Sequence, residues 1–183
     1  MMKHLKEEKT FVLIKPDGVQ KGLIGEIIKR FEQRDLKIVA LELFQPTVEE
    51  IDKHYPSLGT YQKYNIDPKP ILGTDNPAEI GKMVRGWIVD YMSSAPLVRV
   101  VVQGLHAVDM VRKIAGSTLP YQADMGTIRG DFSNDSPALA NSEKRAVMNL
   151  MHASETQEEA KHEITHWFDD SNILDYKRFG VDE

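Results

Sequence analysis

The chain alternates apolar runs with amphipathic segments, and this alternation limits the folds it can adopt more than any other feature. Residues 10–14 and 97–103 are rich in β-branched and aliphatic side chains, as buried strands are. In residues 24–31, isoleucine and phenylalanine recur at helical spacing between charged residues. A chain that repeats strands and helices in this way builds a sheet covered by helices.

The expected elements can be assigned along the whole chain. We expect strands at residues 10–14, 37–44, 97–103 and 147–152. Three further helices are expected to begin at capping signals: Thr47 with Glu50, Asn76 before Pro77, and Ser154 with Gln157. A helix is also expected at residues 107–115, a turn at residues 15–18, and mostly loops at residues 55–75 and 116–140.

Four strands with helices between them predict an α/β (α+β) fold. The order fits a ferredoxin-like βαββαβ sandwich, with a four-stranded antiparallel sheet and helices on one face. The chain has 183 residues, enough for one domain with a core, and shows no internal repeat or long linker. We therefore expect residues 1–183 to form a single domain.

Composition narrows the classes of function. The formal net charge is −5, so no overall positive field draws the chain to nucleic acid or to a membrane. There is no cysteine, which excludes disulfides and thiolate metal sites. The N-terminus is polar and no apolar run approaches the roughly 18 residues of a membrane span, so we expect a cytoplasmic protein. An anionic substrate would need a local cluster of cations.

One histidine stands where phosphate chemistry is feasible. His152 follows an apolar run and precedes an expected helix start, where backbone N–H groups favour anions. Neutral imidazole is a good nucleophile, because its unperturbed pKa is roughly 6.5. Lys15 at a strand end, Arg112 on a helix and Arg129 in a loop are candidate cations, although each alone is commonly a surface charge.

A competing pattern lies in the last helix. Residues 162–166 read H-E-I-T-H and match H-E-x-x-H, in which two histidines bind zinc and a glutamate acts as base. A third ligand could come only from carboxylates, since no histidine follows: Asp169, Asp170, Asp175, Asp182 and Glu183. A zinc hydrolase is the alternative that this pattern leaves open.

Three separated motifs resemble the nucleoside diphosphate kinase family. Residues 13–44, beginning LIKPDGVQKG, look like its N-terminal block, and GTIRGDF at residues 126–132 looks like its arginine loop. Asn149-Leu150-Met151-His152-Ala153-Ser154-Glu155 is similar to the signature N-x-x-H-G-S-D. The resemblance extends from residue 10 to residue 176, with the motifs in the family's order.

The resemblance implies an activity and a set of site residues. It implies transfer of the γ-phosphate of a nucleoside triphosphate to a nucleoside diphosphate, by a ping-pong mechanism through phosphohistidine at His152. Glu163 would bond the other imidazole nitrogen, Tyr55 would help position Lys15 and the phosphate, and Ser154 would bond Glu163 or the phosphate. The phosphates and ribose would be held by Lys15, Arg112, Thr118, Arg129 and Asn149.

The resemblance also implies partners. Mg²⁺ would be the cofactor, carried by the nucleotide phosphates rather than held in a protein site. Nucleoside di- and triphosphates would be the small-molecule partners, with no nucleic acid and no membrane. A homo-oligomer, either a hexamer or a tetramer, is expected.

Several positions depart from the family's pattern. Ala153 replaces a glycine, which disfavours positive φ, and Glu155 replaces an aspartate. Insertions are expected at about residues 58–78 and 133–144. The aromatic residue that stacks on the base is left open between Tyr61, Tyr64 and no residue. A binding module that kept the fold and lost turnover is therefore a second alternative.

Overall fold

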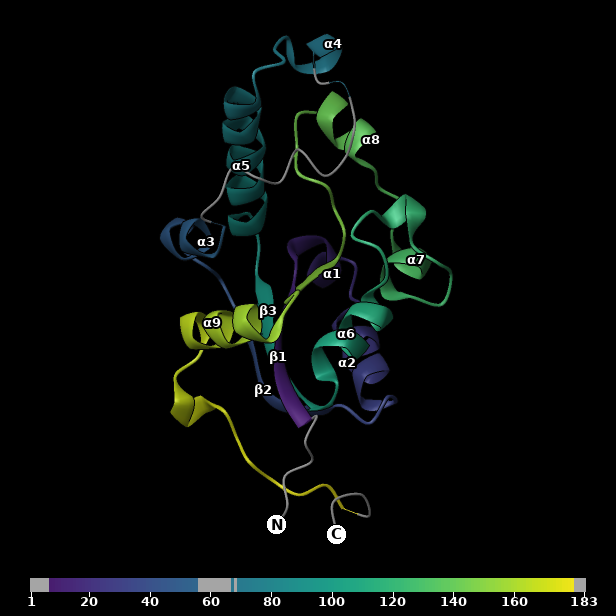
Figure 1. The fold of residues 1–183 in the computed structure, drawn as a ribbon, viewed down its shortest axis with the longest axis vertical. Coiled ribbons are helices and arrows are strands. Elements are labelled where there is room, and N and C mark those ends of the chain that lie inside the picture. The colour runs from purple at the N-terminus through teal and green to yellow at the C-terminus, as the bar shows by residue number, and fades with distance from the viewer. Residues whose placement is uncertain (1–6, 56–66, 68, 180–183) are drawn as a thin grey trace.

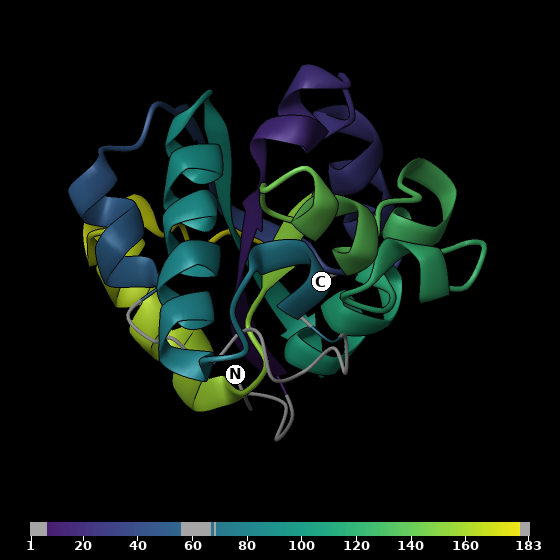
Figure 2. The ribbon, with the colours of Figure 1, turned by 90° about the horizontal axis from the view of Figure 1, so that it is seen from above.

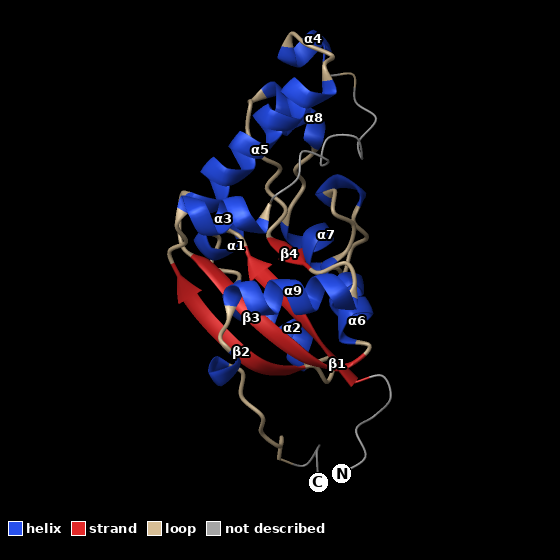
Figure 3. Cartoon of the chain, turned by 60° about the vertical axis from the view of Figure 1, so that its left-hand side comes forward, coloured by secondary structure: helices blue, strands red, loops and turns tan. Residues whose placement is uncertain are grey.

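The computed structural model describes residues 7–55, 67 and 69–179. Its four strands are β1 (Glu7–Ile14), β2 (Lys37–Phe44), β3 (Leu97–Leu105) and β4 (Met151–Ala153). They form one antiparallel sheet in the order β2-β3-β1-β4, which confirms the predicted ferredoxin-like sheet (Figure 3).

Helices connect and cover these strands (Figure 1). They are α1 (Pro16–Gln20), α2 (Ile24–Glu32), α3 (Val48–His54), α4 (Lys69–Leu72), α5 (Pro77–Ser93), α6 (Ala107–Ala115), α7 (Ile128–Phe132), α8 (Pro137–Ser142) and α9 (Gln157–Trp167), with 3-10 turns η2 (Pro120–Gln122) and η3 (Asp170–Asn172). The predicted starts of α3 and α5 are confirmed, because Thr47 and Glu50 form a capping box and Asn76 accepts the Ala78 N–H.

Both faces of the sheet are covered by helices. Phe11 and Leu13 of β1 pack with α3, α5 and α9, whereas Val12 and Ile14 pack with α2 and α6 on the other side, and all four are fully buried. Figure 2 shows the two groups of helices on either side of the strands. The prediction of helices on one face was therefore incomplete: α2 and α6 are the predicted crossover helices, and the other face has a layer of its own.

Short helices replace some of the predicted turns and loops. Residues 15–18 enter α1 rather than a simple turn, and the predicted loop at 116–140 contains η2, α7 and the start of α8. Each of these helices has only three to six residues, fewer than the window in which helical periodicity can be read. The last strand is also shorter than predicted, since β4 begins only at Met151.

The predicted cap of α9 is wrong. Thr156, not Ser154, is the N-cap residue, and its hydroxyl accepts the N–H of Glu159 at 3.1 Å. Ser154 lies just before the helix and uses its hydroxyl on a side chain instead. Two overlapping capping signals are present in the sequence, and tertiary contacts decide between them.

The described parts of the two predicted insertions meet. Helix α4 lies in the first and α8 in the second, and the two helices contact each other beyond the end of α5 (Figure 1). No helix among the described residues is both long and apolar enough to cross a membrane.

Candidate active site

His152 lies on the edge strand β4, paired with Leu13 of β1. Its Nε2 atom is 2.6 Å from Oε1 of Glu163, which α9 holds beside the strand. Within the described part of the chain, the other ring nitrogen, Nδ1, has no hydrogen-bond partner. A neutral ring that donates Nε2–H to Glu163 therefore keeps the Nδ1 lone pair available.

Glu163 is held from its other side by Ser154. The Ser154 hydroxyl donates to Oε2 at 2.6 Å, so both carboxylate oxygens of Glu163 take part in hydrogen bonds. Glu163 is 5% exposed and Ser154 is 0% exposed, and burial raises the pKa of Glu163 above its ordinary value. Of the two roles left open for Ser154, the geometry favours the bond to Glu163.

A second histidine, which the sequence analysis missed, adjoins this pair. The His54 ring is edge-on to the His152 ring, with centroids 4.8 Å apart, and its Nδ1 lies 3.7 Å from Oε1 of Glu163. Trp167 donates its indole N–H to the same Nδ1 at 3.2 Å. No motif signalled His54, although it directly precedes Tyr55, which the resemblance had named.

Both rings are held uncharged by their surroundings. Burial, and then the positive charge of Lys15, lowers the pKa of His152 from 6.5 to about 3. Burial, followed by the neighbouring His152, lowers the pKa of His54 to about 3 as well. At neutral pH, His152 therefore has the uncharged imidazole that nucleophilic attack requires.

Lys15 brings a cation to the same place. It is the N-cap residue of α1, and its Nζ donates to Oδ1 of Asn149 at 2.7 Å. The Asn149 amide in turn donates to the carbonyl oxygen of Thr118 at 2.9 Å. Burial and the charge of Arg129 lower the pKa of Lys15 from 10.5 to about 8. The ammonium is thus charged at neutral pH and loses its proton in mildly alkaline solution.

Arg129 combines charge with support of the main chain. It is 7% exposed, and its guanidinium donates to the carbonyl oxygens of Asn149 at 3.0 Å, Gly116 at 2.7 Å and Met151 at 2.7 Å. The carbonyl groups of Asn149 and Met151 lie on either side of Leu150, the residue before β4. The side chain therefore holds the segment leading to His152 while it adds positive charge to the site.

A cavity of about 700 Å³ joins these groups. All of the predicted site residues except the buried Ser154 line it: Lys15, Tyr55, Arg112, Thr118, Arg129, Asn149, His152 and Glu163. Arg112 reaches it from α6 with 43% of its side chain exposed, and its Nη1 lies 3.9 Å from Oε1 of Glu155. Three cations from distant segments thus line one cavity in a protein of net charge −5.

The rest of the cavity wall combines aliphatic side chains with polar ones such as His162 and Glu159. Helix α5 contributes Val84 and Ile88, and the segment before β4 contributes Ala146 and Val147. The Tyr55 hydroxyl is buried and has no hydrogen-bond partner among the described residues, and burial raises its pKa above the ordinary value. The two tyrosines considered for base stacking, Tyr61 and Tyr64, lie outside the described residues.

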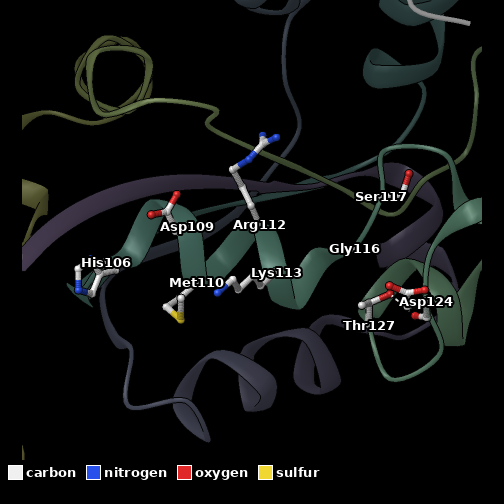
Figure 4. A pocket seen from close by; sticks show the side chains of 9 residues that line it. All are labelled: His106, Asp109, Met110, Arg112, Lys113, Gly116, Ser117, Asp124 and Thr127. Carbon is white, nitrogen blue, oxygen red and sulfur yellow. Dashed lines mark hydrogen bonds between the residues drawn. The ribbon is translucent and has the colours of Figure 1, made fainter.

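A second hollow, of about 670 Å³, follows α6. It shares Arg112, Gly116 and Ser117 with the first cavity but contains neither His152 nor Lys15. Figure 4 shows Arg112 pointing to one side of α6, while Met110 and Lys113 point to the other. Because it contains neither His152, the predicted nucleophile, nor Lys15, the second hollow is not the site of the predicted chemistry.

The zinc alternative is not supported by the geometry. Across the described residues, the one group of three possible metal ligands is His54, His152 and Glu163, which includes neither His162 nor His166. Glu163 faces His152 and Ser154, and the His166 ring is 3.2 Å from the carbonyl oxygen of Glu50. The histidines of the H-E-x-x-H pattern therefore do not converge with a third ligand.

The replacement of glycine by Ala153 causes no backbone strain. Ala153 lies in β4 opposite Val12, and its φ is not positive. The positive φ in this segment belongs to Leu150 instead, at +69°. The alanine methyl group is thus accommodated next to His152.

Comparison with known proteins identifies a family. The profile described as nucleoside diphosphate kinase matches residues 8–67 and 79–173. A nucleoside diphosphate kinase from Pyrobaculum aerophilum is 47% identical over 180 residues, which cover 92% of this chain and 98% of that protein.

Solved structures agree with this match. The crystal structure of an NDP kinase from Pyrobaculum aerophilum is similar with a TM-score of 0.84 and 45% identity, covering 92% of this chain and 100% of that one. A nucleoside-diphosphate kinase from Borrelia burgdorferi, a transition state mimic with bound vanadate and ADP, has a TM-score of 0.79 and 34% identity. That comparison covers 96% of this chain and 95% of the other.

The charge state of His152 can be checked by NMR. Because burial and Lys15 lower its pKa to about 3, we expect its imidazole nitrogen shifts to stay those of the neutral ring from pH 7 to pH 5. In the urea-unfolded chain, the same ring should titrate near the ordinary value of about 6.5. The Lys15→Met variant should move the folded value upward. A folded His152 that titrates near 6.5 would contradict the electrostatic account.

Proposed function

Because the chain belongs to the nucleoside diphosphate kinase family, we propose that it transfers phosphate through His152 by a ping-pong mechanism. In each cycle, the γ-phosphate of a nucleoside triphosphate would move to His152 and then to a nucleoside diphosphate. The observation that supports this most is the 2.6 Å contact between His152 Nε2 and Glu163, since it leaves Nδ1 as the nitrogen with a lone pair.

In the first half-reaction, the Nδ1 lone pair attacks the γ-phosphorus. A P–N bond forms, the bond from phosphorus to the bridging β-γ oxygen breaks, and the nucleoside diphosphate leaves with that oxygen. Positive charge that develops on the ring is stabilised by the Nε2–H bond to Glu163, and Ser154 holds the carboxylate in place. In the second half-reaction, a terminal oxygen of another diphosphate attacks the same phosphorus, and His152 leaves as the neutral ring.

The cations around the cavity would neutralise the phosphate oxygens. Phosphoryl transfer is mainly positioning and stabilisation of charge on the equatorial oxygens. We assign this role to Lys15, Arg112 and Arg129, which line the cavity with His152. Asn149 and Thr118 would complete the contacts to phosphate and ribose, and the buried Tyr55 hydroxyl, which bonds to no other described residue, would donate to the transferred phosphate.

Magnesium would enter with the nucleotide. Mg²⁺ prefers oxygen ligands in octahedral geometry, and it commonly binds substrate phosphates together with one or two carboxylates. In the described residues, the group of three potential ligands has two imidazoles, a set that suits zinc or copper better. We therefore assign Mg²⁺ to the phosphates of the substrate, where it would offset part of their charge.

Little discrimination between bases is expected from this cavity. The aliphatic side chains Val84 and Ile88 of α5 offer packing area but no hydrogen bonds to base edges. A hydrophobic wall distinguishes poorly between planar rings of similar size. A ping-pong enzyme that exchanges phosphate among many nucleotides needs no stronger selection.

The proposed intermediate can be isolated. On incubation with γ-labelled ATP, the chain should retain label that is stable in base and lost in acid, because a phosphoramidate P–N bond hydrolyses when it is protonated. His152→Ala should abolish the label. Its control, His162→Ala, changes another histidine of the cavity wall that the mechanism does not use, and should keep the label.

The same experiment separates the alternatives. A binding module would hold nucleotide without acquiring label. A zinc enzyme would contain stoichiometric metal by elemental analysis and stay unlabelled. Label that survives in His152→Ala would place the phosphate on another residue and refute the mechanism.

The pH dependence of phosphorylation should depend on Lys15. Since burial and Arg129 lower its pKa to about 8, the charge on Nζ is present below that pH and is lost as the pH rises through it. We expect the single-turnover rate to fall above pH 8. Lys15→Arg keeps a charge at all accessible pH values, so that variant should be slower but lack this alkaline limb. If the rate of Lys15→Arg still falls above pH 8, a group other than Lys15 loses the proton that controls the rate.

We also propose a homo-oligomer, either a hexamer or a tetramer. Strand β2 lies at the edge of the described sheet, and it exposes 49% of Leu41 and 58% of Leu43. Long apolar edges are commonly covered by another chain. Light scattering should give a mass several times 20.8 kDa, and a monomer at micromolar concentration would disprove the proposal.

A further inference from the structure

The residue two positions before His152 has an unusual backbone conformation. Leu150 has a φ of +69°, although it is not glycine and is fully buried. The N–H of Met151 donates to the carbonyl oxygen of Asn149 at 2.8 Å, so Leu150 is the central residue of a three-residue turn. Such a γ-turn with positive φ is rare and strained, and persists only where neighbouring groups hold it.

Two segments, α1 with its N-cap residue and α7, hold this turn through hydrogen bonds. The N–H of Leu150 donates to Oδ2 of Asp17 at 3.1 Å, and its carbonyl oxygen accepts the N–H of Lys15 at 2.8 Å. Arg129 binds the carbonyl oxygens on either side, those of Asn149 and Met151. Every polar backbone group at the centre of the turn is therefore satisfied by α1 or its cap.

Asp17 is itself positioned by Tyr91. Asp17 is 5% exposed, and the Tyr91 hydroxyl donates to its other carboxylate oxygen, Oδ1. Burial and the negative charge of Asp17 raise the pKa of Tyr91, so the phenol remains a donor. Among the described residues, no lysine, arginine or histidine forms an ion pair with Asp17. Two neutral donors thus fix both oxygens of a buried carboxylate.

The turn joins two halves of the active site. Asn149, on one side, binds Nζ of Lys15 at 2.7 Å, and β4 with His152 begins on the other side. Helix α1 packs closely against it, because a Cβ added at Gly18 would lie 2.8 Å from the carbonyl oxygen of Leu150. A shift of the turn would therefore move Lys15 and Asn149 relative to the His152 ring.

We propose that Asp17 and Tyr91 are positioning residues for phosphoryl transfer: their hydrogen bonds hold the Leu150 turn, and the turn aligns His152 with Lys15 and Asn149. The inference rests on the proposed function, since it concerns the rate at which His152 is phosphorylated. Neither residue contacts the His152 ring. Asp17 contacts the turn directly, whereas Tyr91, which also lines the cavity, reaches the turn through Asp17.

The test uses two variants and a matched control. Asp17→Asn keeps the shape of the side chain but removes its charge and turns one oxygen into an NH₂ donor, so the side chain can no longer accept from both Tyr91 and Leu150. Tyr91→Phe removes only the hydroxyl that fixes Asp17. The control, Asp90→Asn, removes one negative charge from an exposed neighbour of Tyr91 on α5.

Single-turnover phosphorylation by γ-labelled ATP is the main measurement. A displacement of about 1 Å can slow a reaction by about 100-fold, so we expect a loss of about 10- to 100-fold in Asp17→Asn. Tyr91→Phe keeps the carboxylate and should lose less, about 3- to 10-fold. Asp90→Asn should match the wild type. Binding of ADP, measured by calorimetry, should change little in any variant.

A pH profile distinguishes positioning near Lys15 from a loss of stability. Burial and Arg129 lower the pKa of Lys15, the negative charge of Asp17 raises it, and the net result is a pKa of about 8. In Asp17→Asn, the alkaline limb should therefore move to lower pH, whereas in Tyr91→Phe it should stay in place. Partial unfolding would reduce the active fraction without moving the limb.

The outcomes separate this inference from the proposed function. An unlabelled wild type refutes both. A labelled wild type, with Asp17→Asn equally fast or slowed only in proportion to its unfolded fraction, overturns the inference alone. If Asp17→Asn does not fold, the test depends on Tyr91→Phe. A folded Tyr91→Phe variant that is phosphorylated at the wild-type rate would show that Asp17 and Tyr91 are not positioning residues.

Discussion

The hydrogen bond between His152 and Glu163 is the interaction on which the rest of the site depends. It ties an edge strand to the last helix, and it determines which nitrogen of the ring can react. Ser154 in turn holds Glu163 in place. Its hydroxyl is available for this bond because Thr156, not Ser154, caps α9. The carboxylate of a buried acid is thus paired with one nitrogen of a half-buried ring, and the acid could not stay unpaired at this depth without a loss of stability.

Around that pair, the protein uses burial to control charge. The same desolvation that keeps His152 uncharged also lowers the pKa of Lys15. Arg129 keeps its charge under these conditions, because a guanidinium does not lose its proton in proteins. The result is a cavity that brings together three cations of an acidic chain, with an uncharged imidazole and three glutamates also in its wall. In the proposed reaction, phosphate would therefore be attracted by individual side chains rather than by the overall charge of the chain.

Much of this arrangement could be predicted from the sequence, but not all of it. Helix α6 and strand β2 have the predicted bounds, because the strand-forming residues of β2 and the helical periodicity that ends at Gly116 in α6 are local signals. The motifs also led to the residues that line the cavity. His54 was missed because its importance comes from a ring 98 positions away in the chain (residues 54 and 152), which no local pattern encodes. The turn at Leu150 was missed because leucine gives no sign of positive φ, and tertiary hydrogen bonds enforce it.

The bonding of Arg129 has a consequence for how this protein can change over time. One side chain supplies positive charge to the cavity and also ties together the carbonyl oxygens of Gly116, Asn149 and Met151. A lysine there would keep the charge but could not reproduce three directed bonds. Selection for a stable fold and selection for catalytic activity would therefore both act on the guanidinium group of Arg129. A descendant that no longer needed the reaction would still be under pressure to retain the arginine, so its presence alone is a poor marker of an active enzyme.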